Sequence, residues 1–228
     1  ATALLKDGQV VTVDGTAGTV TARSTDARAY VLPLRDISAT DRRTVGSKAA
    51  NLGEMMRAGM RVPEGFALTV CAFDRFMEDN RVPADASPET VAKAHIPEDV
   101  AGALSAAAAE LGDAALAVRS SAVAEDLAGA SFAGQYETVL NVRSEDELFG
   151  GVVRCWSSAF SSRVASYRSA HERQGAPAMA LLVQTMVPAD VAGVAFSANP
   201  VSGDRSEAVV SAVRGLGERL VSGEASPD

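Results

Sequence analysis

Cysteine, histidine and aromatic residues are scarce in this sequence of 228 residues. It contains two cysteines, two histidines and one tryptophan, and aromatic residues make up 5% of the chain. This composition excludes the familiar zinc patterns, which need closely spaced cysteine and histidine ligands. We interpret Cys71 and Cys155 as buried or half-buried thiols without a redox role. The hydrophobic core must therefore rest on alanine, valine and leucine.

Basic residues are fewer than acidic residues, and long apolar runs are missing. The net charge of −8 argues against a nucleic-acid-binding surface, because such a surface needs a basic face. No run of about 18 uncharged apolar residues occurs, so no membrane span is expected. The alanine-rich segment 101–117 comes nearest, and Glu110 and Asp113 interrupt it. No signal peptide is visible, which makes the cytoplasm the expected location. The first residue is Ala1 rather than Met, so we expect a processed or excerpted sequence.

Helices and strands are predicted in a mixed order. Residues 1–29 have the pattern of short strands with turns at Asp7-Gly8 and Asp14-Gly15, followed by a polar linker. A loop running into a helix is predicted over 45–59, and a loose connection over 83–97. Further helices are predicted near 72–79, 98–111, 144–159 and 162–174, and strands near 66–70, 116–118, 136–142, 178–187, 193–198 and 207–213. Because strands and helices do not alternate regularly, an α+β fold is favoured over a doubly wound sheet.

The segment from Leu116 to Thr138 carries the strongest candidate for chemistry. A short apolar run ends on Arg119, and a loop of small residues that includes Gly134 follows. Arginine binds phosphate oxygens through two parallel hydrogen bonds, and small residues let backbone N–H groups approach an anion. The segment therefore suits a phosphate site. A surface hairpin with an ordinary arginine explains the same pattern equally well.

Two further polar residues stand in informative surroundings. Lys48 follows Gly46-Ser47 at the start of a predicted helix, where it can reach a phosphate or simply be solvated. This is not a Walker loop, because the first glycine is missing and Ala49 replaces Ser or Thr. Gln184 interrupts an apolar run and needs a partner if it is buried, either an adenine edge or a backbone group.

Other polar residues give weaker signals. Glu125 and Asp126 can bind magnesium, but an acidic loop is more often simply solvated. His95 and His171 lack the small-residue setting of a phosphorylated histidine, so we interpret both as structural. No metal ligands are assigned.

Several motifs occur together and in one order. They are VGSKAANLGEM at 45–55, VPEGF at 62–66, VRSSAVAED at 118–126, SFAGQYET at 131–138 and GVAFSANP at 193–200. This series resembles the ATP-binding domain of the phosphoenolpyruvate synthase, pyruvate phosphate dikinase and rifampin phosphotransferase family. The ending, from Ala198 to Asp228, looks most like the rifampin phosphotransferase branch. The resemblance covers about residues 30–228.

The resemblance implies an ATP-grasp fold, with ATP between two subdomains and Mg²⁺ as a cofactor. Residues 30–187 would form the first subdomain and 188–228 the truncated start of the second. In that family the β-phosphoryl of ATP passes to a histidine on a swivelling domain and then to a small acceptor such as pyruvate, and AMP is a product. By the resemblance, Lys48 and Arg119 hold phosphates, Gly134 and Thr138 line the nucleotide loop, and Gln184 lies near the adenine.

The sequence also departs from the family pattern. Ser47 stands where the family usually has a second glycine before the lysine. The magnesium-binding Glu and Gln of the family are expected beyond Asp228, and the phosphorylated histidine is absent. Residues 6–20 resemble the C-terminal end of the swivelling phosphohistidine domain, so 1–29 would be the tail of that domain with a linker, and the domain is the expected partner in cis or in trans. The alternative is a non-catalytic fragment or split subunit that binds only nucleotide or such a partner.

Overall fold

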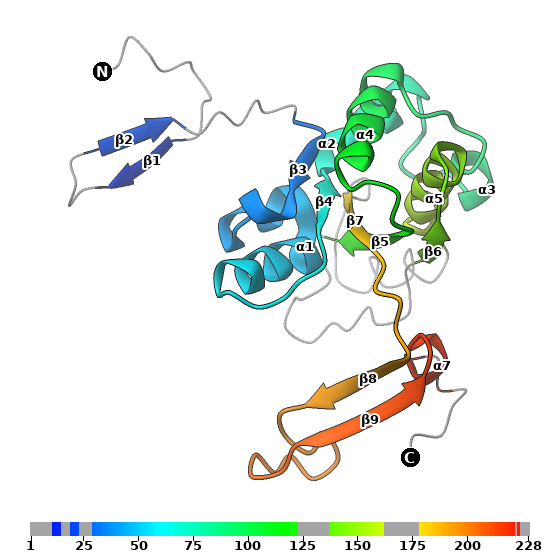
Figure 1. Cartoon of the computed structure of the whole chain (residues 1–228). Helices are drawn as coiled ribbons and strands as arrows, with labels where there is room; N and C mark the ends of the chain where they lie inside the picture. Colours follow the sequence, from blue (N-terminus) through cyan, green and yellow to red (C-terminus); the bar gives the residue numbers. More distant parts are fainter. Residues whose placement is uncertain are drawn as a thin grey trace. The chain divides into compact units, whose positions relative to one another are not determined.

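The computed structural model describes residues 11–14, 19–22, 29–122, 137–161, 178–221 and 223. The chain divides into two compact units, Ala1–Met186 and Val187–Asp228 (Figure 1). Near the N-terminus, β1 (Val11–Asp14) pairs with β2 (Thr19–Ala22) in an antiparallel ribbon. The other residues of the predicted N-terminal strands lie outside the described residues, as does the helix predicted near 162–174.

A five-stranded sheet forms the centre of the first unit. Its strands are β3 (Val31–Pro33), β4 (Gly65–Leu68), β5 (Leu116–Ala122), β6 (Thr138–Val142) and β7 (Met179–Thr185). They lie in the order β3-β4-β7-β5-β6, and every neighbouring pair is antiparallel. The last strand in sequence is therefore the central strand in space. β7 is buried from Met179 to Gln184, which explains its nearly continuous apolar sequence.

One face of the sheet carries the larger core. Phe66, Val183 and Val118 lie opposite one another on β4, β7 and β5 and so point to the same face. They pack with buried side chains of α2 (Val70–Asp79), α4 (Glu98–Glu110) and α5 (Glu145–Ser158). Trp156 is fully buried there, and its ring centroid lies 4.7 Å from that of Phe76.

The opposite face is covered by α1 (Arg42–Arg57). Ala67 and Leu182 of the sheet are fully buried against Val45, Ala49 and Ala50 of this helix. Two 3₁₀ turns lead into α1, at Leu34–Asp36 and Ala39–Asp41, and the first adds Leu34 to this smaller core. The sheet thus lies between α1 on one side and α2, α4 and α5 on the other (Figure 1).

The mixture of helix and strand predicted from the sequence is confirmed, and local signals account for several helix ends. Ser144 begins α5 and its hydroxyl accepts the N–H of Glu147 at 3.2 Å. Gly59 follows α1 with φ +77°, the conformation expected of a helix-ending glycine. The prediction of a loose connection over 83–97 is wrong in one respect. It contains a short helix, α3 (Pro88–Val91), which Ser87 caps.

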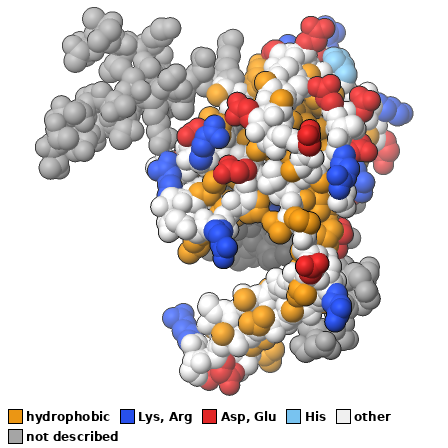
Figure 2. All heavy atoms as spheres, in the orientation of Figure 1, with side chains coloured by type: hydrophobic (Ala, Val, Ile, Leu, Met, Phe, Trp, Pro, Cys, Tyr) orange, Lys and Arg blue, Asp and Glu red, His pale blue; other side chains and the backbone are white. Residues whose placement is uncertain are grey.

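The second unit is built on a hairpin. β8 (Val191–Phe196) and β9 (Val209–Arg214) pair antiparallel, and a short helix, α7 (Glu218–Val221), follows. Hydrophobic side chains are visible on the surface of this hairpin (Figure 2), where Val191 and Val210 are more than half exposed. Among the described helices, none has the length and apolar character needed to cross a bilayer.

Candidate functional site

The helix α1 is interrupted at Gly46, where it touches β5. Gly46 has φ 75° and ψ 171°, values far from those of a helix, so residues 42–45 and 47–57 form two helical segments. A Cβ atom at Gly46 would lie 1.8 Å from the carbonyl oxygen of Ser121 on β5. Only glycine permits both this conformation and this close contact of two backbones.

Ser121 joins the two segments of α1 to the sheet. Its buried hydroxyl donates to the carbonyl oxygen of Val45 at 2.8 Å and accepts the N–H of Ala49 at 3.2 Å. The first N–H groups of a helix have no partner within the helix. Here a strand residue supplies the cap that a neighbouring residue usually supplies. The start of the segment 47–57 is thereby held against the C-terminal end of β5.

Two positive side chains meet β5 at this junction. Lys48 Nζ donates to the carbonyl oxygen of Ser120 at 3.0 Å. Arg119, the preceding residue of β5, is half-buried and points to the face that α1 covers, because it lies opposite Leu182. Among the described residues, no carboxylate forms an ion pair with Arg119. Two cations on this side of the sheet favour the binding of an anion.

Thr138 and Gln184 lie on the same face of the sheet. Thr138 of β6 is directly opposite Arg119, and Gln184 of β7 is opposite Ala117. Arg119 and Gln184 are therefore diagonal neighbours, about 7–8 Å apart for such positions. Gln184 is 6% exposed, and its Nε2 donates to the carbonyl oxygen of Pro63 at 3.1 Å. The backbone partner considered from the sequence is thus present.

A glycine makes room for that amide. Gly65 lies opposite Gln184 on β4, and a Cβ atom there would lie 2.8 Å from Gln184 Cγ and 2.3 Å from the carbonyl oxygen of Val183. The hydrogen bond to Pro63 therefore orients the amide of Gln184 on the α1 face, and the missing side chain of Gly65 leaves the space that Gln184 occupies.

Four of the five candidate residues predicted from the sequence, Lys48, Arg119, Thr138 and Gln184, share the α1 side of the sheet. Gly134 lies outside the described residues, and so do Glu125 and Asp126. Ser121 was not predicted, although a hydroxyl two residues after Arg119 points to the same face of a strand. Within the described part of the chain, no cluster of His, Cys, Asp and Glu is suited to a metal ion.

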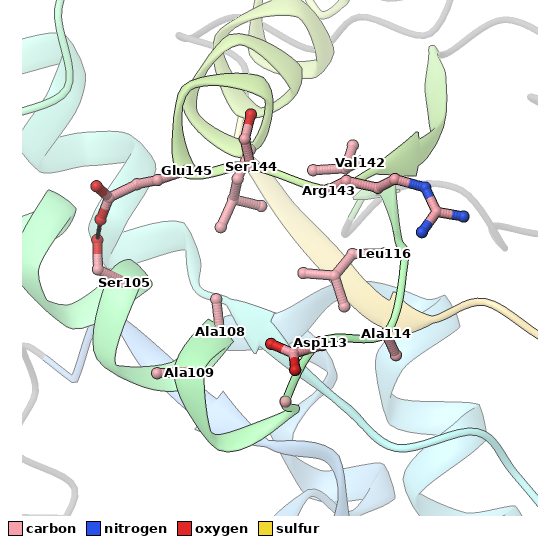
Figure 3. Close-up of a pocket in the computed structure, with 12 residues that line it drawn as sticks. Ser105, Ala108, Ala109, Asp113, Ala114, Leu116, Val142, Arg143, Ser144 and Glu145 are labelled. Atoms are coloured by element: carbon pink, nitrogen blue, oxygen red, sulfur yellow. Dashed lines mark hydrogen bonds between the residues drawn. The ribbon is translucent and has the colours of Figure 1, made fainter.

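A cavity of about 280 Å³ lies elsewhere, on the other side of the sheet (Figure 3). The turn after α4, the first residue of β5 and the start of α5 form its walls, with Asp113, Leu116 and Arg143 among the lining residues. Ser105 donates a hydrogen bond to Glu145 across it (Figure 3). Lys48, Arg119, Thr138 and Gln184 do not line this cavity, and its charges are mixed. It is therefore separate from the candidate site.

The two thiols are placed as predicted. Cys155 is buried and Cys71 is half-buried. Burial, with the nearby Glu137 carboxylate, raises the pKa of Cys155 to about 12, and burial also raises the pKa of Cys71. Both thiols therefore stay protonated near neutral pH, which makes them poor nucleophiles.

Comparison with known proteins identifies a family. Residues 42–228 match the family described as "Pyruvate phosphate dikinase, AMP/ATP-binding domain". A rifampicin phosphotransferase from Streptomyces sp is 42% identical over 225 residues, covering 87% of this chain and 26% of that protein. A probable phosphoenolpyruvate synthase from Staphylothermus marinus is 38% identical over 232 residues, covering 87% of this chain and 28% of that protein.

A third relative is an uncharacterized phosphotransferase, YvkC, from Bacillus subtilis. It is 40% identical over 188 residues, covering 80% of this chain and 23% of that protein. This chain therefore spans about a quarter of the length of these relatives.

Proposed function

The chain belongs to the pyruvate phosphate dikinase AMP/ATP-binding domain family, and we propose that Lys48 and Arg119 hold the phosphates of ATP in a dikinase-type phosphotransferase. The observation that supports this most directly is that Lys48, just after the kink of α1, donates to the residue next to Arg119 on β5, while Arg119 lies on the face that α1 covers. Phosphoryl transfer depends mainly on positioning and on neutralising charge, and one cation on a strand beside another on the helix packed against that strand suits both.

The neighbouring residues take secondary roles in this proposal. Gln184 lies near the adenine, and its hydrogen bond to Pro63 holds the amide in one orientation. Thr138, opposite Arg119, and Gly134 line the nucleotide loop. The fold assigned to the domain is ATP-grasp-like, with its first subdomain at 30–187. A cytoplasmic location stays a prediction.

The full reaction belongs to the longer protein of which this domain would be part. There, the β-phosphoryl of ATP would pass to a histidine on a swivelling domain, in cis or in trans, and then to a small acceptor such as pyruvate or a rifamycin-like hydroxyl. AMP and phosphate would be released. Among the described residues, no group of three or more His, Cys, Asp and Glu side chains is placed to hold a metal ion, so the ligands of Mg²⁺ are expected outside them. A purely non-catalytic role is not favoured, because the relatives are named as synthases and phosphotransferases.

Calorimetry of ATP binding tests the proposal. Lys48→Met and Arg119→Met each remove a charge-assisted hydrogen bond, worth about 1.5–3 kcal/mol, so ATP should bind about 10- to 150-fold more weakly. Arg75→Met is the matched control, because Arg75 is a partly exposed arginine of α2 bound to Asp79 and Asp99. It should bind ATP as the unchanged protein does. Equal affinity in all variants, or no ATP binding to the unchanged protein, would contradict the proposed site.

Product analysis tests the reaction class. With the complete protein, a dikinase should convert ATP to AMP and phosphate. ADP as the nucleotide product would instead indicate ordinary kinase chemistry and would refute the dikinase assignment.

A further inference from the structure

Ser47 carries a buried hydroxyl that the protein itself does not use. It is the first residue of the helical segment 47–57, directly before Lys48, and it is 1% exposed. Its Oγ has no hydrogen-bond partner among the described residues. A buried polar atom without a partner costs about 1–3 kcal/mol, so proteins rarely keep one without a reason.

The polar groups around Ser47 are already engaged. The Ser121 hydroxyl both donates and accepts, through Val45 and Ala49. The carbonyl oxygen of Ser120 accepts from Lys48 Nζ. In the described part of the junction between α1 and β5, the hydroxyl of Ser47 is therefore the one buried side-chain polar atom without a partner.

The position of Ser47 indicates what kind of group would satisfy it. The N-terminal end of a helical segment has a partial positive charge and favours anions. Lys48 adds a full positive charge at the next residue. The other two buried side-chain atoms without a partner in the described ranges belong to Trp156 and Ser161, in α5 and just after it. Of these three atoms of the described residues, the Ser47 hydroxyl is the one that lies at the start of a helical segment and next to a lysine.

We propose that the Ser47 hydroxyl donates a hydrogen bond to a phosphate oxygen of the bound nucleotide, which makes Ser47 a further phosphate-binding residue beside Lys48. This rests on the proposed ATP site. In the free protein the hydroxyl is buried and unpaired, so a phosphate oxygen reaches it only when the groups that cover it move as the nucleotide binds; in the complex it is then paired with a charged acceptor. The free energy lost by leaving it unpaired is thus recovered only when the nucleotide binds.

The proposal makes opposite predictions for stability and for binding. Ser47→Ala removes an unsatisfied hydroxyl, so the melting temperature of the nucleotide-free protein should stay the same or rise. The same change should weaken ATP binding about 10- to 150-fold, the loss of affinity expected when one hydrogen bond to a charged group is removed. Adenosine, which has no phosphate, should bind both proteins equally.

Ser121→Ala is the matched control. It also removes one buried hydroxyl from this junction, but that hydroxyl has two partners, so the melting temperature of the nucleotide-free protein should fall. The melting temperatures are measured by circular dichroism and the affinities for ATP and adenosine by calorimetry.

The outcomes separate this inference from the proposed function. If the unchanged protein binds ATP and Ser47→Ala binds it equally well, Ser47 does not contact the phosphates and the ATP site stands. A loss of adenosine affinity, or a fall in melting temperature like that of Ser121→Ala, would assign Ser47 a structural role and overturn the inference. If the unchanged protein binds no ATP, the proposed function itself fails.

Discussion

Replacing Gly46 with alanine should damage the junction between α1 and β5 in two ways. The first is conformational, because φ 75° and ψ 171° lie in a region that is essentially reserved for glycine. The second is steric, because the new Cβ would lie 1.8 Å from the carbonyl oxygen of Ser121 and 2.4 Å from its carbonyl carbon. Those atoms belong to a strand that is paired with β7, so they cannot easily move away.

The glycine that follows the same helix, Gly59, separates the two effects. Gly59 has φ +77°, nearly the same as Gly46, but nothing lies within 4 Å of a Cβ atom placed there. Gly59→Ala should therefore cost only the conformational penalty of about 1–2 kcal/mol. Gly46→Ala should cost about 2–6 kcal/mol, the sum of about 1–3 for its backbone conformation and about 1–3 for overpacking.

Urea unfolding followed by tryptophan fluorescence measures both variants. Trp156 is the only tryptophan of the chain and is fully buried in the first unit, so its emission follows the unfolding of that unit. If Gly46→Ala proves no more destabilising than Gly59→Ala, the close contact of α1 with β5 is not the constraint described here. ATP binding measured on a folded Gly46→Ala protein should also be weaker, because Lys48 would move with the helix.

Three further perturbations test other parts of the structure. Because the pKa of Cys155 is about 12 in the folded protein and 9.0 for an ordinary thiol, the free energy of unfolding should fall as pH rises from about 9 toward 12. Urea titrations should show a steeper fall for the unchanged protein than for Cys155→Ala, which keeps only the smaller contribution of Cys71. Gln184→Glu would place a carboxylate against the carbonyl oxygen of Pro63, so it should lower the urea midpoint at pH 7 more than Gln184→Met does, and the gap should narrow at acid pH. Phe76→Ala should cost about 3–5 kcal/mol and shift the emission of Trp156; a cost below about 1 kcal/mol would contradict the packing described.

Helices and strands whose ends or apolar pattern are marked by neighbouring residues could be predicted from the sequence. The helix predicted over 98–111 is α4, which begins after Pro97 and ends before Gly112 at φ +70°. The apolar run at 178–187 is β7. Both depend on residues close in sequence. The order of the strands could not be predicted, because β7 pairs with β4 and β5, which lie far away along the chain.

The same distinction holds for the candidate site. Arg119 and Lys48 could be proposed from their own neighbours in sequence. The loop predicted before Lys48 is in fact helical from Arg42, interrupted only at Gly46. That helix start depends on the hydroxyl of Ser121, 72 residues beyond Ala49, and no local pattern encodes such a cap. The burial of the Ser47 hydroxyl could not be predicted from neighbouring residues either, because it results from tertiary packing.

The strands of the five-stranded sheet are synthesised in an order that differs from their order in space. β4 and β5 emerge well before β7, yet each pairs with β7 and not with the other. Until Thr185 leaves the exit tunnel, the facing edges of β4 and β5 present unpaired N–H and C=O groups, which invite association with other chains. The nascent chain should therefore depend on chaperones until its central strand arrives. Truncation before Met179 should leave two unfinished half-sheets rather than a smaller stable domain.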